Sequence, residues 1–520
     1  MAPSMRVALV WVNTQGPSGL NHGVLILARE LREAGHPVSL HCLGGAQGQH
    51  TDAKGLVKEL AAARPGLVGL SFASPEAGVA RGLVRSMRAA MPGSLIFCGG
   101  IHATLDPEGV FAWPELDGVG MGELDGGHFA RLVTRLARGE RPSQVPGFWL
   151  RWDGKEHRNP MASLPDIEDQ PLPLYEGLDL DGLVRAKRGF GEVLASRGCP
   201  FRCRFCQNAA VVERYRESLG TSPSSWPYVR RRGLDGLMAE LLELKARAPS
   251  LQAIMFADDR LAGDPAWLEV FADRYRKEIG LPFIANATAD QIDPRTAALL
   301  RHAGCNMVKI GVECAPGELR RRVLGRPESE AVLRAAFERL RAAGINAMAY
   351  LMIGIPGEDP DALAETFRFC ASLRPDAVRL AMFCPYPGTA VHADLVARGV
   401  LGPEDRSRGF GDPSALPWTD EMRRLLALAQ RLLPWLLNQH LVSVGAASRA
   451  LVARWWAGGK APCCLDELAS EEASLWRELE RAGLPHYACP FPERPDYVFL
   501  MAEREQPLIN VGGSKVTTGP

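Results

Sequence analysis

The sequence predicts an α/β protein made of three parts, and three observations support this. Short apolar runs alternate with amphipathic stretches over about the first 140 residues and again over about residues 184–386, as in strands joined by helical crossovers. A Pro-rich connector, Leu164 to Tyr175, separates the two blocks, and beyond Thr389 the pattern becomes helical. We expect a Rossmann-like domain over residues 1–145, a linker over 146–185, a partial (β/α)6 TIM barrel over 186–400 and a mostly helical domain over 401–520.

The first block contains five apolar runs that suit a parallel sheet. Such a sheet is covered by helices on both faces, so its strands read as continuous apolar segments. Ligands bind such sheets at the carboxyl ends of the strands, which places residues 13–23, 71–74, 99–104 and 122–125 at the expected site. The expected strands are Arg6–Val12, Pro37–Cys42, Gly66–Phe72, Ser94–Cys98 and about Asp117–Val119.

The second block repeats strand and helix six times, which predicts an open version of the barrel with reactive groups at the strand ends. The helical region that follows carries Leu and Trp at helical spacing over Asp420–Asn438 and Leu441–Trp456. The expected barrel strands are Glu192–Ser196, Ala253–Ala257, Pro282–Asn286, Met307–Gly311, Ala347–Ile353 and Ala377–Met382.

Charge and composition favour an enzyme of the cytoplasm. The 520 residues include 60 Lys plus Arg and 60 Asp plus Glu, so nothing favours nucleic acid or an anionic membrane as a partner. No apolar run approaches the roughly 20 residues that span a bilayer, and the first residues show no signal-peptide pattern. The twelve cysteines do not resemble a disulfide framework in a chain of this length.

Three thiols with the spacing Cys199-x3-Cys203-x2-Cys206 carry the most specific chemical signal. One loop can present all three to three irons of a [4Fe-4S] cluster, which leaves the fourth iron open. Electron-transfer clusters normally use four cysteines, so the open iron implies a bound substrate or cofactor. The alternative is three buried cysteines that cluster by chance, but Gly198 and Pro200 suit a loop.

This spacing, with Phe205 before the last cysteine, resembles the radical S-adenosylmethionine (radical SAM) family. In that family the open iron binds the amino and carboxylate groups of SAM, and the reduced cluster cleaves SAM to a 5′-deoxyadenosyl radical. Each strand-end residue could instead belong to an ordinary turn. The resemblance implies SAM contacts from Phe205, from Asp258 or Asp259, and from Asn286, Thr288, Glu313 and Ile355.

The loops of the first block lack Gly-x-Gly-x-x-Gly after the first strand, which argues against a dinucleotide. The run Cys98–Thr104 and Gly122-Glu123 resemble the cobalamin-binding domain that precedes many radical SAM domains, where glycines let the backbone approach a flat corrin. No Asp stands two residues before His22, so we expect cobalt without a protein histidine below it. The alternative is a Rossmann-like module that holds no corrin. The expected cobalamin contacts are Thr14, Gln15, Leu20, Ser71, Gly99, Gly100, His102, Gly122 and Glu123.

The resemblance spans about residues 5–400 and implies [4Fe-4S], SAM and cobalamin as cofactors, with an electron donor such as flavodoxin or ferredoxin. It further implies a C-methyltransferase that moves a methyl group from SAM, through methylcobalamin, to an unactivated carbon of a small natural-product-type substrate after hydrogen abstraction. No catalytic residue is assigned beyond the cofactor sites. The C-terminal helices would cover the substrate pocket. The alternatives are a non-methylating cobalamin radical SAM enzyme (ring contraction, cyclisation, oxidation or carbon–carbon coupling) and a non-catalytic iron–sulfur sensor.

Other features have open or structural interpretations. Arg230–Arg232 is either a solvated basic patch or a contact to the SAM carboxylate or a corrin side chain. Cys463-Cys464 and the distant Cys489 do not repeat the cluster spacing, and residues 512–520 resemble a disordered tail. Four isolated cysteines are expected in the core: Cys305, Cys314, Cys370 and Cys384.

Overall fold

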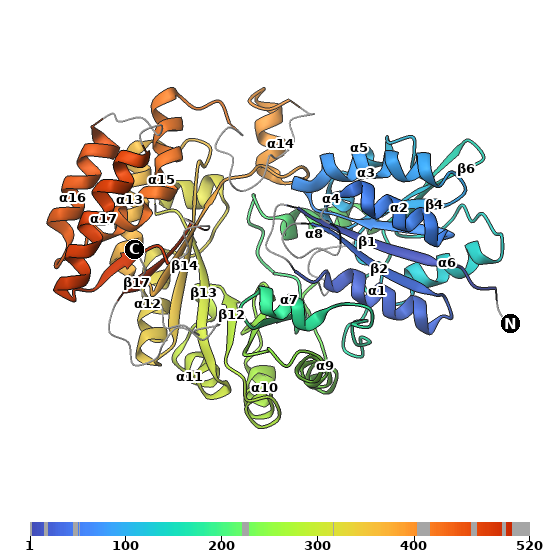
Figure 1. The fold of residues 1–520 in the computed structure, drawn as a ribbon, viewed down its shortest axis with the longest axis horizontal. Helices are drawn as coiled ribbons and strands as arrows, with labels where there is room; N and C mark the ends of the chain where they lie inside the picture. Colours follow the sequence, from blue (N-terminus) through green and yellow to red (C-terminus); the bar gives the residue numbers. More distant parts are fainter. Residues whose placement is uncertain are drawn as a thin grey trace. The chain divides into compact units, whose positions relative to one another are not determined.

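The computed structural model divides the chain into two compact units, which are described separately (Figure 1). Unit 1 consists of Met1–Asp259, Pro385–Ala397 and Gly402–Gly409, and unit 2 of Arg260–Cys384, Arg398–Leu401 and Phe410–Pro520. Expectations for Gln15, Cys463, Cys464 and residues 512–520 lie outside the described residues. The structure describes residues 3–14, 19–44, 50, 52–220, 228–315, 317–402, 416–458, 465–490, 494 and 496–501.

Unit 1 begins with a doubly wound sheet in the order β2-β1-β3-β4-β5-β6-β7, in which β1 to β5 are parallel. Helices α1 and α6 cover one face, and α2 to α5 lie on the other (Figure 1). The strands are β1 (Val7–Asn13), β2 (Val38–Gly44), β3 (Leu67–Ser71), β4 (Leu95–Gly99), β5 (Gly118–Gly120), β6 (Phe148–Trp152) and β7 (Lys155–Arg158). The helices are α1 (His22–Glu33), α2 (Ala53–Ala63), α3 (Ala77–Ala90), α4 (Ile101–Leu105), α5 (Pro107–Phe111) and α6 (His128–Ala137).

The sheet continues into the stretch over residues 146–185 that was expected to be a linker. Strand β6 pairs antiparallel with β5, and β7 pairs with β6. Phe148, Leu150 and Trp152 alternate inward along β6, and the turn places Asp153 and Gly154 at φ 50° and 74°. An Asp-Gly turn with two positive φ angles is a strong hairpin signal. The first sheet therefore ends at Arg158 rather than near residue 145.

The rest of unit 1 contains the first two barrel strands, which pair in parallel. The first was expected over Glu192–Ser196, but β8 covers Phe190–Val193, because Phe190 pairs with Ala253. Ser196 instead belongs to a short antiparallel pair with the segment at Arg230. The elements are α7 (Leu180–Ala186), β8, β9 (Ser196–Arg197), α8 (Gln207–Leu219), β10 (Arg230–Arg231), α9 (Leu234–Arg247), β11 (Ala253–Phe256) and α14 (Ala390–Ala397).

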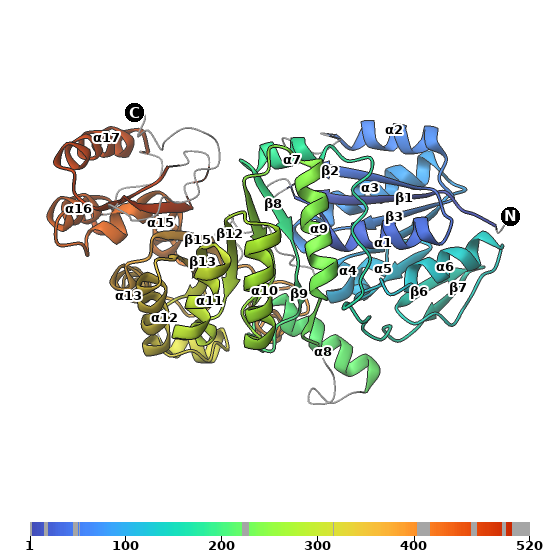
Figure 2. The same cartoon turned by 90° about the horizontal axis from the view of Figure 1, so that it is seen from below.

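Unit 2 carries four further parallel β/α repeats, with sheet order β16-β17-β15-β14-β13-β12. Helices α10 to α13 follow one another along one face of this sheet (Figure 2). Each begins behind an Asp or Ser whose side chain accepts a hydrogen bond from a first-turn amide, at Asp264, Asp293, Ser329 and Asp359. The elements are α10 (Pro265–Glu278), β12 (Phe283–Ala287), α11 (Pro294–Ala303), β13 (Cys305–Glu313), α12 (Glu330–Ala342), β14 (Asn346–Ile353), α13 (Pro360–Leu373) and β15 (Ala377–Met382).

The C-terminal region is mostly helical, as expected, but it also contributes two strands to unit 2. β16 (His486–Ala488) and β17 (Tyr497–Met501) pair antiparallel, and β17 extends the sheet beside β15. Trp435 and Trp455 are fully buried, and Trp435 stacks on Trp476 with ring centroids 3.9 Å apart, so these side chains belong to the core. Within the described ranges, no helix is both long and apolar enough to cross a bilayer. The helices are α15 (Asp420–Asn438), α16 (Gly445–Val452) and α17 (Leu465–Ala482).

Candidate active site

The cysteine loop lies between β9 and α8 in unit 1. Gly198 opens it at φ 93°, and a Cβ there would lie 2.5 Å from the Tyr228 carbonyl oxygen, so only glycine fits. At the other end Cys206 is the N-cap residue of α8, and its amide donates to the Cys203 carbonyl at 3.1 Å. Cys203 is buried, while Cys199 and Cys206 are half-buried. One short loop thus holds the three thiols, as the sequence predicts.

The surroundings of these thiols suit a metal cluster. Burial, together with the neighbouring Cys203 and Asp259, raises the pKa of the Cys206 thiol to about 12. A thiol with such a pKa stays protonated at neutral pH unless a cation stabilises the thiolate. The N-terminus of α8 adds a favourable partial charge beside Cys206. The donor set therefore fits an iron–sulfur cluster.

The two carboxylates after β11, which the sequence left as alternatives, have different surroundings. Asp258 is fully buried, and its two oxygens accept hydrogen bonds from the Ala195 amide at 3.0 Å and from the Ser196 hydroxyl. Burial raises its pKa to about 6. Asp259 is exposed, and its carboxylate interacts with the side chain of Asn208. Asp258 therefore fastens the end of β11 to the start of β9, whereas the Asp259 carboxylate is exposed.

Two adjacent glycines, Gly99 and Gly100, lie at the carboxyl end of β4, beside Ser71 at the end of β3. Gly100 has φ 89°, and a Cβ there would lie 2.7 Å from the Ser71 hydroxyl oxygen and 3.0 Å from the Phe72 amide nitrogen. A Cβ at Gly99 would meet only the Gly120 carbonyl oxygen, at 3.7 Å, so the space beside this residue is open. Ser71 also accepts a hydrogen bond from the Asn21 side chain at 3.3 Å. This edge fits a flat, bulky group such as a corrin.

Two other expected cobalamin contacts, Thr14 and Leu20, lie in the same loop region, exposed and half-buried respectively. His102 lies elsewhere: its side chain is fully buried, its Nδ1 is 3.0 Å from the Ser74 hydroxyl oxygen, and its ring packs against Phe72.

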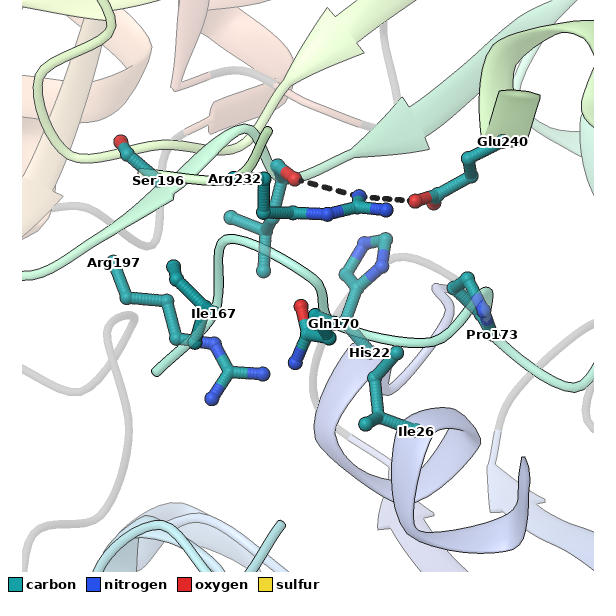
Figure 3. A pocket seen from close by; sticks show the side chains of 10 residues that line it. His22, Ile26, Ile167, Gln170, Pro173, Ser196, Arg197, Arg232 and Glu240 are labelled. Atoms are coloured by element: carbon teal, nitrogen blue, oxygen red, sulfur yellow. Dashed lines mark hydrogen bonds and ion pairs between the residues drawn. The ribbon is translucent and has the colours of Figure 1, made fainter. Parts of the chain in front are cut away.

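His22 is the histidine for which the sequence predicts no role as a ligand below cobalt. Its side chain points into a small cavity of unit 1 (Figure 3). Burial lowers the pKa of its ring, which is therefore neutral. Arg232 lines the same cavity and is paired with the buried Glu240, which also accepts the Tyr175 hydroxyl at 2.9 Å. Arg232 is thus a core ion-pair residue, and the basic-patch interpretation of residues 230–232 is wrong for this position.

Glu123 connects the loop after β5 to the cysteine loop. Its carboxylate binds Arg197, two residues before Cys199, and Arg230, each at 2.5 Å. Burial favours the protonated carboxyl, but the Arg197 and Arg230 guanidiniums outweigh it and hold the pKa of Glu123 below its usual value. The Glu123 amide donates to the Tyr215 hydroxyl on α8 at 2.8 Å. Sequence reasoning missed Arg197 and Tyr215, because neither stands in a recognisable motif.

Gly122 shows how tightly this loop packs on α8. It has φ 73°, and a Cβ there would lie 2.2 Å from the Tyr215 hydroxyl oxygen and 2.6 Å from the Met161 methyl carbon. Arg197 also binds Asp125 at 2.9 Å. Within unit 1, the glycine-rich sheet edge and the cluster loop are therefore held together by direct contacts.

In unit 2, Glu313 ends β13 with φ 63°, a left-handed conformation that is strained for a residue other than glycine. Burial raises its pKa, although Arg326 and Arg320 oppose this. Arg326 donates to the Gly311 carbonyl at 2.6 Å and pairs with Glu328 at 3.1 Å. Such strain concentrates at functional sites, and the SAM contact of Glu313 stays a prediction.

The other strand-end residues of unit 2 differ in their exposure and in their hydrogen bonds. Asn286 is half-buried at the end of β12. The Thr288 hydroxyl oxygen accepts a hydrogen bond from Arg260 at 2.8 Å, so it is engaged by the segment that follows β11. Ile355 is fully buried, and Glu358 accepts hydrogen bonds from the amides of Ile355 and of the preceding glycine at 3.3 and 2.6 Å. The Ile355 carbonyl also accepts a hydrogen bond from the Glu358 amide at 2.9 Å, so both backbone groups of Ile355 are engaged by Glu358.

Glu358 holds the loop after β14 and was not selected from sequence, although it ends the loop run Ile353–Glu358. Burial raises its pKa to about 8, despite the two amide hydrogen bonds. The isolated cysteines are buried, which confirms their assignment to the core: Cys305, Cys314, Cys370 and Cys384.

Comparison with protein families identifies two domains in the chain. The Radical SAM superfamily model matches residues 193–370, and the B12 binding domain model matches residues 9–127. The first range contains the three cluster cysteines and the second contains the glycine-rich sheet edge.

Curated relatives include the uncharacterized methyltransferase PH0819 of Pyrococcus horikoshii, 25% identical over 312 residues, which are 59% of this chain and 64% of the relative. The anaerobic magnesium-protoporphyrin IX monomethyl ester cyclase of Rubrivivax gelatinosus is 23% identical over 344 residues, 64% of this chain and 59% of the relative. The chain thus spans less than two thirds of the length of either relative.

Two solved structures share the fold. The radical SAM methyltransferase TsrM of Kitasatospora setae, with tryptophan and a SAM analogue bound, has a TM-score of 0.60, 18% identity and 76% coverage of each chain. The cobalamin-dependent SAM radical enzyme OxsB, with aqua-cobalamin and SAM bound, has a TM-score of 0.64 and 16% identity, covering 92% of this chain and 71% of its own.

Proposed function

We propose, on the premise that this chain is a cobalamin-dependent radical SAM enzyme, that it is a C-methyltransferase acting on an unactivated carbon of a small natural-product-type substrate. When bound, the cofactors would supply the chemistry, a 5′-deoxyadenosyl radical that removes a substrate hydrogen and a cobalamin that delivers the methyl group of SAM. The protein's part is to bind, orient and shield these groups.

The observation that carries this proposal is the contact between Glu123 and Arg197. It joins the loop after β5, at the edge that fits a corrin, to the chain two residues before Cys199. Arg230 and the Tyr215 hydroxyl reinforce the same contact. A corrin held at this edge would be fixed relative to the cluster, as a reaction that uses both cofactors requires.

The residues of unit 1 have definite proposed roles. Cys199, Cys203 and Cys206 would hold the cluster, and the Ser71 and Gly99–Gly100 edge would hold the corrin. Asp259 would accept the SAM ammonium in a charge-assisted hydrogen bond, and Asp258 would position it. The SAM contacts expected at the strand ends of unit 2 stay predictions: Asn286, Thr288, Glu313 and Ile355.

The test begins with anaerobic reconstitution of the chain with iron, sulfide and hydroxocobalamin, followed by metal analysis. We expect about four irons and one cobalt per chain, and Cys199→Ala should lose the iron but keep the cobalt. Cys370→Ala, which alters a buried cysteine outside the motif, is the matched control and should keep both metals. Iron without cobalt would refute the cobalamin-dependent mechanism.

A second step separates methyl transfer from other radical chemistry without knowledge of the substrate. The reduced holoenzyme is incubated with methyl-deuterated SAM, and the extracted cobalamin is examined by mass spectrometry. Label recovered with the cobalamin supports the methyltransferase. Formation of 5′-deoxyadenosine without such label supports the non-methylating alternative, which the cyclase among the relatives favours. Absence of both products would leave the iron–sulfur sensor.

The remaining expectations concern the substrate class, the partners and the location of the protein. The tryptophan in the TsrM structure supports a small-molecule substrate class for this chain as well. The electron donor, such as flavodoxin or ferredoxin, the absence of a nucleic-acid partner and the cytoplasmic location stay predictions.

A further inference from the structure

We propose that His41, His50 and Glu59 form a binding site for one zinc ion at the edge of the first sheet of unit 1. His41 lies in β2, the outermost strand of that sheet, and Glu59 lies in α2. His50 pairs with Leu43 beside β2. A ring nitrogen of each histidine and a carboxylate oxygen all lie within 4.8 Å of one another. None of these residues belongs to the cofactor sites described above.

The distances suit a metal better than a hydrogen-bonded pair. His41 Nδ1 lies 3.4 Å from one oxygen of Glu59, and His50 Nε2 lies 3.3 Å from the other. Two zinc–ligand bonds of about 2.0–2.1 Å at a tetrahedral angle separate the ligand atoms by about 3.3 Å. Ordinary N–H···O hydrogen bonds are shorter, about 2.7–3.2 Å. Each histidine nitrogen thus lies at the spacing of zinc ligands from one oxygen of Glu59, and the donor atoms of all three residues converge within 4.8 Å.

His41 is prepared as a ligand. Its side chain is only 5% exposed, and its Nε2 lies 2.9 Å from the Ser39 hydroxyl oxygen. This contact orients the ring with Nδ1 toward Glu59, as outer-shell partners of metal-bound histidines do.

The other two ligands are fixed by backbone structure, His50 by hydrogen bonds to β2 and Glu59 by its place in α2. The His50 amide donates to the Cys42 carbonyl at 3.1 Å, and its carbonyl accepts from the Gly44 amide at 3.2 Å. Glu59 stands on α2, whose start is fixed by the Asp52 cap. Its side chain is 55% exposed, which leaves room for water as a fourth ligand and a route for exchange.

The donor set favours a transition metal such as zinc over magnesium or calcium. Two imidazole nitrogens and one carboxylate suit zinc, whereas magnesium and calcium prefer oxygen ligands. The ion would join α2 to the edge strand β2, a strand whose outer hydrogen-bonding groups are otherwise vulnerable to pairing with another chain. The competing interpretation is a plain ion pair, which needs a protonated histidine and binds no metal.

The experiment measures zinc binding to the reconstituted holoenzyme, in which the cluster occupies the motif cysteines, by calorimetric titration with zinc chloride and by metal analysis after dialysis. We expect one zinc per chain in the wild type. Glu59→Gln and His50→Ala should weaken zinc binding by at least about 100-fold, and Ser39→Ala by about 10-fold. Zinc should raise the midpoint of thermal unfolding of the wild type but not of Glu59→Gln.

The matched control is His302→Ala, because His302 also lies beside a carboxylate, that of Asp273 at 2.8 Å. Among the described residues His302 belongs to no group of three metal-ligating side chains, so this variant should bind zinc like the wild type. Unchanged iron and cobalt contents in every variant would show that each one folds. Equal zinc affinity in the wild type, Glu59→Gln and His50→Ala, or equal affinity of the wild type for magnesium and zinc, would overturn the proposal.

Discussion

The strand ends of the two units differ in the residues that they carry. At the carboxyl edge of the first sheet the chain places glycines, and at Gly100 and Gly122 a Cβ would collide with Ser71 or Tyr215. At the strand ends of unit 2 the chain instead places acidic side chains, the half-buried Glu313 in a strained conformation and the buried Glu358 on two loop amides. Glycines that let a ligand approach the backbone suit a flat, bulky ring. Burial raises the pKa of both unit 2 carboxyls, and Glu358, with a pKa of about 8, is protonated at neutral pH.

The largest expected effect concerns the cluster loop, which is next to the glycine-rich edge. Cys203→Ser should lose the iron and reduce 5′-deoxyadenosine formation by at least about 1,000-fold, because the cofactor carries the difficult chemistry. Cobalt binding should remain. Iron and cobalt analysis together with chromatography of the product measures this, and Cys370→Ser is the matched buried control. Joint loss of both metals would show that the edge and the loop fold as one element.

The carboxylates of unit 2 should give a dependence of stability on pH. The folded-state pKa of Glu358 is raised from 4.5 to about 8 by burial, so the folded state binds more protons between these pH values. The free energy of unfolding should therefore fall as pH rises from about 4.5 to 8, by up to about 5 kcal/mol, and Glu358→Gln should remove this slope.

Anaerobic urea unfolding at several pH values measures this difference. Glu338→Gln, a change of an exposed glutamate on α12 of the same unit, should leave the slope unchanged. If the free energy of unfolding depends on pH in the same way in the wild type and in Glu358→Gln, the raised pKa of Glu358 is contradicted.

The glycines of the first sheet should respond to added side chains. Gly122→Ala and Gly139→Ala both place alanine at a positive φ, 73° and 80°, which costs about 1–2 kcal/mol. Only at Gly122 does the new methyl group also meet Tyr215 and Met161, whereas nothing lies within 4 Å at Gly139. For Gly122→Ala alone we expect the free energy of unfolding to fall by a total of about 3–4 kcal/mol and the cobalt content to fall as well. Urea unfolding and metal analysis measure the two effects. Equal losses of stability in Gly122→Ala and Gly139→Ala would mean that the loop after β5 moves to accommodate the new methyl group.

The smallest expected effect separates the two carboxylates after β11. Asp259→Asn should raise the SAM concentration for half-maximal 5′-deoxyadenosine formation by about 10- to 100-fold, because a charge-assisted hydrogen bond contributes about 1.5–3 kcal/mol. Asp258→Asn keeps an acceptor for the Ala195 amide and should change that concentration only a few-fold. The reverse order would assign the SAM contact to Asp258.

Much of the fold could be predicted because helices and parallel strands have strong local patterns. The strand Ala377–Met382 and the helix Asp420–Asn438 have the expected bounds. The hairpin β6–β7 was missed because its Asp-Gly turn was included in the linker expected over residues 146–185. β17 was missed because its pairing partner, β15, is more than 100 residues away. Short edge strands depend on distant partners more than on their own sequence.

The sequence by itself determined the cluster loop, because three ligands within eight residues leave little freedom in geometry, and it determined the glycine-rich edge through residues that only a close backbone approach requires. Only the tertiary structure decided that Glu123 binds Arg197 and Arg230. It also decided that Asp258 is buried and hydrogen-bonded while Asp259 is exposed. The convergence of His41, His50 and Glu59 likewise depends on the tertiary structure. The physical reason is that spacing fixes contacts within a loop, whereas contacts between distant segments depend on how the sheets and helices pack.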